Sequence, residues 1–477
     1  METSDDPVIQ RQRRLGQALA EWRKAADLSQ GQLARRLSYD RTTVAHAERG
    51  AQVPAEDFWR SCDAVLAAEG TLVRLYEAVQ EAKQRKAEQA AARARAERWA
   101  RLAGLSRTDA ASGKPGQTPT VWKRSSSEAI PDAATLVRED VPVDHQDDYA
   151  SLPVSEDEER LLFAARNPRR LDRKAVEGFA GMLASQRRLE DDLGSAVLIE
   201  PVTAQLAVMA EPVREASGPL RPVITDLAAQ YAQFCGWLSA SAGQPAETSN
   251  AWFDHALEWA TEAGNTNLIA NAMSFKGHIA WVAGRPGAVI GLSAAARRDR
   301  RVFIAQRAYD AGQEARGHAM TGDSPTTDRL LAEAADLAER AADHTDDTPP
   351  WQYYYSPTFF TLQRGLTYRH LAARHPQRNK LAVDLLTAGL AGLPDDLRGA
   401  EWAADFIHQL AIAHAQAGEP EQACARAAMV AAIGSETSSE RLLTDARHLH
   451  ARLAGRWRGH TAVAELGRTL GVQFPIA

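Results

Sequence analysis

The chain has 477 residues, of which 44% are hydrophobic and 25% charged, and its formal net charge is −6. This length exceeds what one hydrophobic core can organise, so we expect two or three domains. The negative charge argues against a general affinity for nucleic acid. Aromatic residues make up 6% of the chain, whereas Ala, Leu, Arg and Glu, the strongest helix formers, are abundant, and this composition favours an all-α fold.

The cysteines and the apolar segments exclude several classes of protein. Cys62, Cys235 and Cys424 lie far apart and form no Cys-x-x-Cys pair, so we expect reduced thiols and neither a disulfide framework nor a zinc site. The first residues lack the basic and apolar regions of a secretory signal. No apolar run approaches the ~18 residues that span a bilayer. We therefore expect a cytoplasmic protein.

The charges are unevenly distributed along the chain. Residues 1–103 contain 18 Lys and Arg against 15 Asp and Glu, a net charge of +3, so the remainder carries −9. A basic head on an acidic body is expected when the head alone meets phosphate.

Residues 1–79 are predicted to form one domain, in which residues 13–79 fold into five short helices. Leu15, Leu19 and Trp22 give the first helix one apolar face. The second helix follows Ser29, which with Gln32 three residues later matches a capping box, in which each side chain satisfies a free backbone N–H group. The expected buried residues of the later helices are Leu33, Ala34, Leu37, Val44, Ala47, Phe58, Cys62, Val65, Leu66, Leu72, Leu75, Tyr76 and Val79.

The third helix is predicted to run from Arg41 to about Arg49. Asp40 is a suitable N-cap residue, Gly50 a suitable terminator, and Pro54 prevents the helix from resuming. Two short helices joined by a tight turn, with polar residues facing outward from the second, form the geometry that enters a DNA major groove.

The exposed face of this third helix supplies the candidate DNA contacts. Arg41 and His46 are the expected base readers, since Arg can bridge guanine O6 and N7. Gln30 lies at the start of the second helix, where backbone dipoles favour a phosphate. The predicted DNA-binding residues are Gln30, Arg41, Thr42, Thr43, His46 and Arg49.

Residues 13–66 resemble the XRE family, the helix-turn-helix domains of phage repressors and Cro. The resemblance rests on Leu28, Ser29, Gln30, Leu33, Ala34, Val44, Glu48, Gly50 and Pro54. It implies phosphate contact by Gln30 and base contact by Arg41, Thr42 and His46. One departure is Ser38, at a turn position that is often Gly, because Ser tolerates a positive φ less well.

Two polar residues of this region have competing interpretations. Glu48 is interpreted as the structural partner of Arg23 on the first helix, rather than as a functional acid. His46 is interpreted as a residue facing DNA, rather than as a pH sensor.

The next two segments differ in composition. Residues 80–103 are predicted to form a basic, Ala-rich helix, which we interpret as solvated; contact with flanking phosphates and dimerisation are the alternatives. Residues 104–158 are rich in Pro, Ser, Gly and acidic residues without hydrophobic periodicity, which predicts a disordered linker. The acidic group Asp144–Asp148 within it is interpreted as solvated rather than metal-binding.

Residues 159–477 show helical patterning interrupted by turns near Gly243, Gly284, Gly322, Pro376 and Gly418. These turns recur at intervals of roughly 40 residues, in the range of helical solenoids. Residues 402–430 resemble a tetratricopeptide repeat in the placement of small residues at Ala411, Ala423 and Ala427, with Leu410 and Ile412 supplying bulk. An irregular helical bundle is the alternative. The aromatic run Trp351–Tyr355 is interpreted as packing between repeats rather than as a pocket lining.

The whole layout resembles actinomycete regulators, and also the peptide-sensing regulators of Gram-positive bacteria that join a similar head to tetratricopeptide repeats. It implies a nucleoid-associated, homodimeric transcription regulator that binds double-stranded DNA and responds to a peptide, small molecule or partner protein. The alternative is an interaction scaffold with generic DNA attachment, for instance in plasmid maintenance. No hydrolase, zinc-protease or P-loop motif occurs, so we expect no enzyme activity, cofactor or metal.

The predicted linker provides the first test. Limited proteolysis should cut the intact chain between about residues 105 and 158 and release two stable helical fragments, because an extended segment enters a protease readily. Mass spectrometry of the fragments locates the cuts, and resistance throughout this segment would contradict the prediction.

Overall fold

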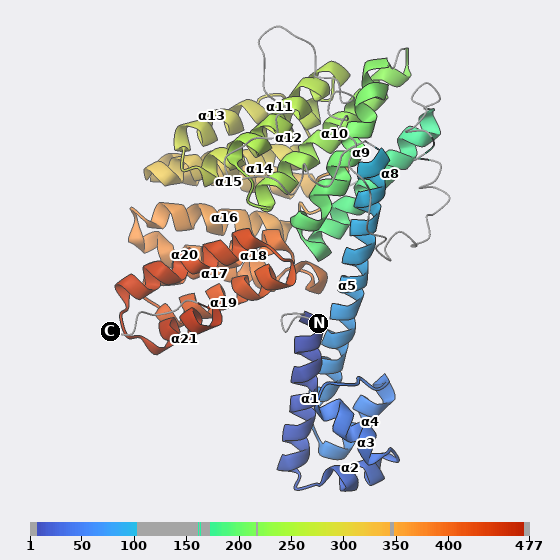
Figure 1. Ribbon diagram of the computed structural model, residues 1–477. Helices are drawn as coiled ribbons and strands as arrows, with labels where there is room; N and C mark the ends of the chain where they lie inside the picture. Colours follow the sequence, from blue (N-terminus) through green and yellow to red (C-terminus); the bar gives the residue numbers. More distant parts are fainter. Residues whose placement is uncertain are drawn as a thin grey trace. The chain divides into compact units, whose positions relative to one another are not determined.

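The computed structural model describes residues 7–102, 161, 163, 172–215, 218–343 and 348–471. Within these residues every regular element is a helix (Figure 1), which confirms the expected all-α fold. The chain divides into two compact units, Met1–Ala91 and Ala92–Ala477. The predicted linker 104–158, including Asp144–Asp148, lies outside the described residues.

The first unit contains four short helices and the beginning of a long one. They are α1 (Pro7–Ala25), α2 (Gln30–Leu37), α3 (Arg41–Glu48), α4 (Glu56–Leu66) and α5 (Thr71–Leu102). Helix α5 is continuous, so the fifth helix and the basic helix expected at 80–103 form one element. The border between the two units falls within it, at Ala91.

The core of the first unit contains the apolar residues expected from sequence, together with Trp59 and Ala68, which were not expected. Leu15, Leu19, Val44 and Phe58 are at most 1% exposed. Trp59 is also fully buried, and its indole Nε1 donates a 3.1 Å hydrogen bond to the carbonyl of Pro54. The ring of Trp59 packs edge-on against Phe58, with the ring centroids 5.1 Å apart. The loop that follows α3 is thereby tied to α4.

A buried carboxylate, Asp63 of α4, caps the start of α5. It accepts hydrogen bonds from the backbone N–H groups of Gly70 at 2.6 Å, Leu72 at 2.8 Å and Val73 at 3.2 Å. The first N–H groups of a helix have no partner within it, and a side-chain acceptor supplies one. Asp63 therefore fixes the junction between α4 and α5.

The second unit is a succession of helices. They are α8 (Arg173–Leu193), α9 (Ser195–Glu215), α10 (Leu220–Ser241), α11 (Ala246–Ala263), α12 (Thr266–Val282), α13 (Pro286–Ala296), α14 (Ile304–Thr321), α15 (Ser324–Ala341), α16 (Pro357–Ala372), η6 (Pro376–Arg378), α17 (Asn379–Ala391), η7 (Asp395–Leu397), α18 (Glu401–Ala417), α19 (Pro420–Glu436), α20 (Glu440–Arg456) and α21 (Thr461–Thr469).

The five turns expected from sequence each join the two members of a helix pair: α10 with α11, α12 with α13, α14 with α15, α16 with α17, and α18 with α19. Gly243, Gly284, Gly322 and Gly418 have φ values of +74°, +67°, +85° and +84°. This left-handed conformation ends a helix with little strain only in residues that lack a Cβ atom. Pro376 instead begins the short 3-10 helix η6 between α16 and α17.

Successive pairs also pack against each other. The first helices of the pairs form a continuous series, in which α10 contacts α12, α12 contacts α14, α14 contacts α16, and α16 contacts α18. Fully buried alanines, including Ala411 and Ala423, let α18 and α19 approach closely. The domain therefore grows by repeating a two-helix unit.

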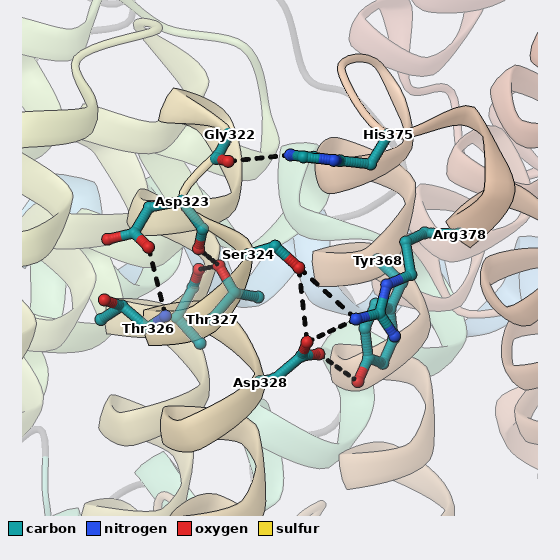
Figure 2. A network of polar contacts seen from close by, with 10 residues as sticks. Gly322, Asp323, Ser324, Thr326, Thr327, Asp328, Tyr368, His375 and Arg378 are labelled. Carbon is teal, nitrogen blue, oxygen red and sulfur yellow. Dashed lines mark hydrogen bonds and ion pairs between the residues drawn. The ribbon is translucent and has the colours of Figure 1, made fainter.

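Polar contacts join the turn of one pair to the next pair (Figure 2). His375 Nε2 donates to the carbonyl of Gly322 at 2.9 Å. Asp328 on α15 accepts hydrogen bonds from Tyr368 Oη at 3.0 Å and from Arg378. These bonds fix the spacing between the α14–α15 and α16–α17 pairs.

The contribution of the Asp63 cap to stability can be tested by substitution. Asp63→Ala removes the acceptor for three backbone N–H groups, and should lower the free energy of unfolding of a 1–102 fragment by about 2 kcal/mol. Chemical denaturation measures the change, with Asp57→Ala, an exposed position on the same helix, as the matched control. Equal midpoints for the two variants would show that the cap contributes nothing.

Candidate nucleic-acid interface and helical-domain cavity

Helices α2 and α3 form a tight helix-turn-helix. The capping box predicted at the start of α2 is confirmed: Gln32 N donates to Ser29 Oγ at 3.2 Å, and Ser29 N donates to Gln32 Oε1 at 2.7 Å. Ser38 ends α2 with φ +58° and ψ +38°, so this serine adopts the left-handed conformation that Gly usually provides. The N–H of Tyr39 then bonds to the carbonyl of Ala34 at 3.0 Å, which closes the turn.

One ion pair connects the three helices that carry this motif. Arg23 of α1 donates to Glu48 of α3 through Nε at 2.5 Å and Nη2 at 3.0 Å, and its Nη1 bonds to the carbonyl of Leu28 at 2.7 Å. The two side chains are 11% and 7% exposed. Gln30 of α2 donates its amide to Glu48 Oε2 at 2.8 Å. The hydrogen bond to Glu48 raises the pKa of Arg23, so the guanidinium stays charged.

The outward face of α3 is polar and accessible. Val44 and Ala47 are buried beneath it, at 0% and 1% exposed. The exposed residues on this face are Arg41, Thr42, His46 and Arg49, and Thr43 is half-buried. Arg49 directly follows the helix, and its Nε donates to the carbonyl of Ala45 at 3.2 Å. These five residues thus lie together on α3 or at its end.

Two features of this region differ in detail from the sequence-based expectations. Asp40 occupies the N-cap position of α3, but its side chain accepts no hydrogen bond from that helix. Gln30 is half-buried, and its amide nitrogen donates one N–H to Glu48, so the second N–H of that amide is left for a phosphate.

Other residues near the motif were missed from sequence. Tyr39 in the turn is 40% exposed, and its ring packs edge-on against Phe58. Arg35 and Arg36 are exposed on α2; the buried stripe of that helix already implied that they face outward. Gly16 of α1 permits close approach of α3, since a Cβ atom there would lie 2.4 Å from the carbonyl oxygen of Ala47.

The second unit contains a cavity that opens to solvent, and the space between its walls, including the part outside the mouth, is about 910 Å³. Its helical walls come from the first helix of successive pairs, α8, α10, α12, α14, α16 and α18, and the segment around Trp351 completes them. The lining residues are Arg187, Glu190, Asp191, Gln233, Phe234, Trp237, Phe275, His278, Trp281, Tyr309, Arg316, Trp351, Tyr353, Tyr354, Phe359, Gln363, Leu366, Trp402, Asp405, Phe406 and Gln409.

Aromatic rings dominate this lining. Phe, Tyr and Trp supply 11 of the 21 lining residues, although they form 6% of the chain. Trp351, Tyr353 and Tyr354 are among them, so the 351–355 run lines the cavity, the alternative to packing between repeats, while Trp351, Tyr354 and Tyr355 also pack in the hydrophobic core. Such a lining offers flat apolar faces on which a planar ligand can stack.

The acidic groups of the cavity are hydrogen-bonded within the protein. Glu190 accepts from Ser195 Oγ at 2.6 Å and Trp237 Nε1 at 3.2 Å, and burial raises its pKa to about 8. Asp191 accepts from Tyr353 Oη at 2.7 Å and from the indole of Trp402 at 2.9 Å; burial raises its pKa to about 6.

The basic groups are held differently. Arg187 is 4% exposed and lies over the rings of Phe234 and Trp351, 5.8 Å and 5.9 Å from their centroids. Arg316 is 1% exposed and lies 4.8 Å from the ring centroid of Trp281. Neither arginine forms an ion pair with a carboxylate of the described residues, and burial lowers the pKa of both. Sequence reasoning missed these residues; arginines within otherwise apolar helix stripes were the available signal.

Comparison with known proteins supports the helix-turn-helix fold of the first unit. Residues 14–75 match a family model described as a helix-turn-helix domain, the segment that contains α2, the turn and α3. No curated protein matches the chain. No helix within the described ranges is long and apolar enough to cross a membrane. The N-terminal unit is therefore a helix-turn-helix domain, the kind of domain through which regulators bind DNA.

The ion pair generates a quantitative prediction. Glu48→Ala leaves Arg23 nearly buried without its counter-charge and Gln30 without its acceptor, so the free energy of unfolding of the 1–102 fragment should fall by about 3 kcal/mol. The control is Glu56→Ala, which removes an exposed ion pair with Arg60 and should change stability by less than about 1 kcal/mol. Chemical denaturation compares the two, and equal losses would contradict a structural role for Glu48.

Proposed function

We propose that this protein is a sequence-specific transcription regulator of the XRE type. Its helix-turn-helix domain binds double-stranded DNA, and its tetratricopeptide-like domain binds an effector. It acts in the cytoplasm, at the nucleoid, by binding rather than by catalysis. The observation that carries this proposal is the accessible polar face of α3, held by the Arg23–Glu48 pair within a helix-turn-helix domain.

The chemistry of that face supports base recognition. Arg41 at the first position of α3 is exposed and carries the fork of donors that matches guanine O6 and N7. Thr42 and His46 are exposed further along the same helix, where a hydroxyl and an imidazole can meet base edges. Thr43, Arg49 and Gln30 at its margins are suited to positioning contacts with phosphates.

The packing of the second unit supports an effector domain. Helix pairs, four of them joined at glycine turns and each packed on the next through its first helix, are what a tetratricopeptide-like array requires. That plan gathers the first helices around a cavity lined by aromatic and charged side chains. A largely preformed apolar cavity with a few convergent polar groups is typical of ligand sites.

We further propose a homodimer. One recognition helix reads a few base pairs, and a head with a net charge of +3 should bind DNA weakly at physiological salt. Two heads joined through the effector domain would bind half-sites about one helical turn apart and combine their affinities. Helical solenoids also end in faces that need covering, which favours contact through the second unit.

Base recognition is tested at Arg41. Arg41→Ala should weaken binding to the preferred operator by about 1–3 kcal/mol and abolish discrimination at one base position. Binding titrations on an operator series, with Arg60→Ala of α4 as the control, measure both effects. An equal loss on operator and random DNA would identify Arg41 as a phosphate contact instead.

Assembly is tested by solution mass. Light scattering of the intact chain and of residues 159–477 should give a dimer for both. A monomeric intact chain with full operator affinity would contradict the proposed dimer. A dimeric chain with a monomeric 159–477 fragment would move the contact to the helix at 80–102.

A further inference from the structure

The cavity of the second unit holds two buried positive charges that the described residues leave without an ion-pair partner. Arg316 Nη2 donates to the amide oxygen of Gln363, its Nε has no hydrogen-bond partner, and its guanidinium lies against Trp281. Arg187 bonds to the side chain and backbone of Gln230 at 3.4 Å, and its Nε is also unpartnered. A buried charge without a counter-charge destabilises a protein by several kcal/mol.

The surroundings of Arg316 add positive potential rather than compensate for it. Arg369, on α16, is 9% exposed, and burial together with the charge of Arg369 lowers the pKa of the neighbouring His370. His278 lines the cavity, and burial together with Arg316 lowers its pKa to about 3. Both imidazoles are therefore neutral near pH 7, and the guanidinium groups carry the charge on this side.

The acids of the cavity do not neutralise these arginines. Glu190 and Asp191 are engaged by hydroxyl and indole donors, and Asp405 pairs with Arg441 at 2.6 Å. The acidic side chains of the cavity thus have hydrogen-bond or ion-pair partners inside the protein. Arg316 has no partner of opposite charge among the described residues, and Arg187 has only Asp226, which lies beyond ion-pair distance. Burial lowers the pKa of Arg187, and the charge of Asp226 opposes that shift without cancelling it. An anion supplied from outside would complete the arrangement.

We infer that this cavity binds a small organic anion with a planar apolar body, whose carboxylate or comparable anionic group pairs with Arg316, with Arg187 as a second cation. The inference rests on the proposed effector function and specifies its ligand class. The apolar body stacks on the aromatic walls, among them Trp281, Tyr309 and Phe359. The unpartnered amide oxygens of Gln233 and Gln409 accept hydrogen bonds from ligand hydroxyl or N–H groups.

The geometry of the cavity favours such a ligand over a folded partner. Its walls are helix faces, and its polar groups are largely buried, so a folded protein surface cannot reach them. A planar guanidinium matches a carboxylate with two parallel hydrogen bonds, which orients a small acid in the cavity.

A pair of dyes tests the inference on the full-length protein. One is 8-anilinonaphthalene-1-sulfonate, an aromatic anion, and the other is N-phenyl-1-naphthylamine, which has the same ring system without the sulfonate. In Arg316→Gln the Kd of the sulfonate should rise about tenfold or more, whereas the Kd of the neutral dye should change less than about threefold. Arg329→Gln, on exposed α15 surface, is the matched control and should change neither.

Two further measurements distinguish the loss of anion binding from misfolding of the variant. Arg316→Met should keep or raise the thermal midpoint, because it removes a buried charge without a counter-charge, and should still lose sulfonate affinity. In the unaltered protein, 2-naphthoate should displace the neutral dye at about one-tenth the concentration needed by 2-naphthamide. A tetrapeptide with a free C-terminal carboxylate is compared with the same peptide amidated at that end. Displacement of the dye by the free form only would identify the ligand as a peptide carboxylate. Displacement by 2-naphthoate and by neither peptide would identify it as a small acid.

The inference is overturned if Arg316→Gln weakens both dyes equally, if sulfonate affinity survives in Arg316→Gln and Arg187→Gln, or if naphthoate and naphthamide displace equally. Operator binding is measured separately on the same samples. Loss of operator preference with intact anion selectivity would reject the proposed regulator and keep the anion site. Intact operator preference without anion selectivity would reject the anion site and keep the proposed regulator.

Discussion

The bidentate pair between Arg23 and Glu48 is the interaction on which the DNA-binding unit depends. Helices α2 and α3 have eight residues each, too few to be stable by themselves in water. The pair fastens α3 to α1, and Gln30 adds α2 to the same carboxylate. Because an ion pair at this depth tolerates little variation in geometry, it also sets the direction in which the exposed face of α3 points.

The helical domain is organised by a different constraint, the close packing of helix pairs through small residues. Glycine turns and buried alanines keep each pair tight, and the first helices of successive pairs then face one common space. That space contains Arg187 and Arg316, whose buried charges lower stability in the absence of a ligand. Binding of the proposed anion would restore stability at the place where these two charges lower it.

Much of the DNA-binding unit could be predicted from sequence because its determinants are local. The capping box at Ser29 and the polar face that includes Arg41 follow from spacing within a few residues, and the turn at Ser38 followed from the family resemblance over the same stretch. The turns of the helical domain could be found for the same reason, since Gly and Pro mark helix ends directly. Asp63 was missed because a carboxylate among apolar positions gives no sign of the N–H groups that it meets.

The cavity could not be predicted because its residues come together only through the stacking of helix pairs. Arg187 and Gln409 lie on the first and last helices of its wall, α8 and α18, and no local pattern relates them. Periodicity marks a buried position but not its neighbours. The aromatic run at 351–355 was therefore interpreted as packing between repeats, and the structure places three of its residues in the lining of the cavity.

Specific recognition of DNA is the central claim, and mapping of the sites bound by the native chain across its own genome tests it most directly. The account predicts a small set of sites sharing an inverted repeat with half-sites about one helical turn apart, and a preference for such a site over random DNA that persists as salt is raised. An even distribution over the genome, with binding that disappears alike on all sequences as salt increases, would contradict it.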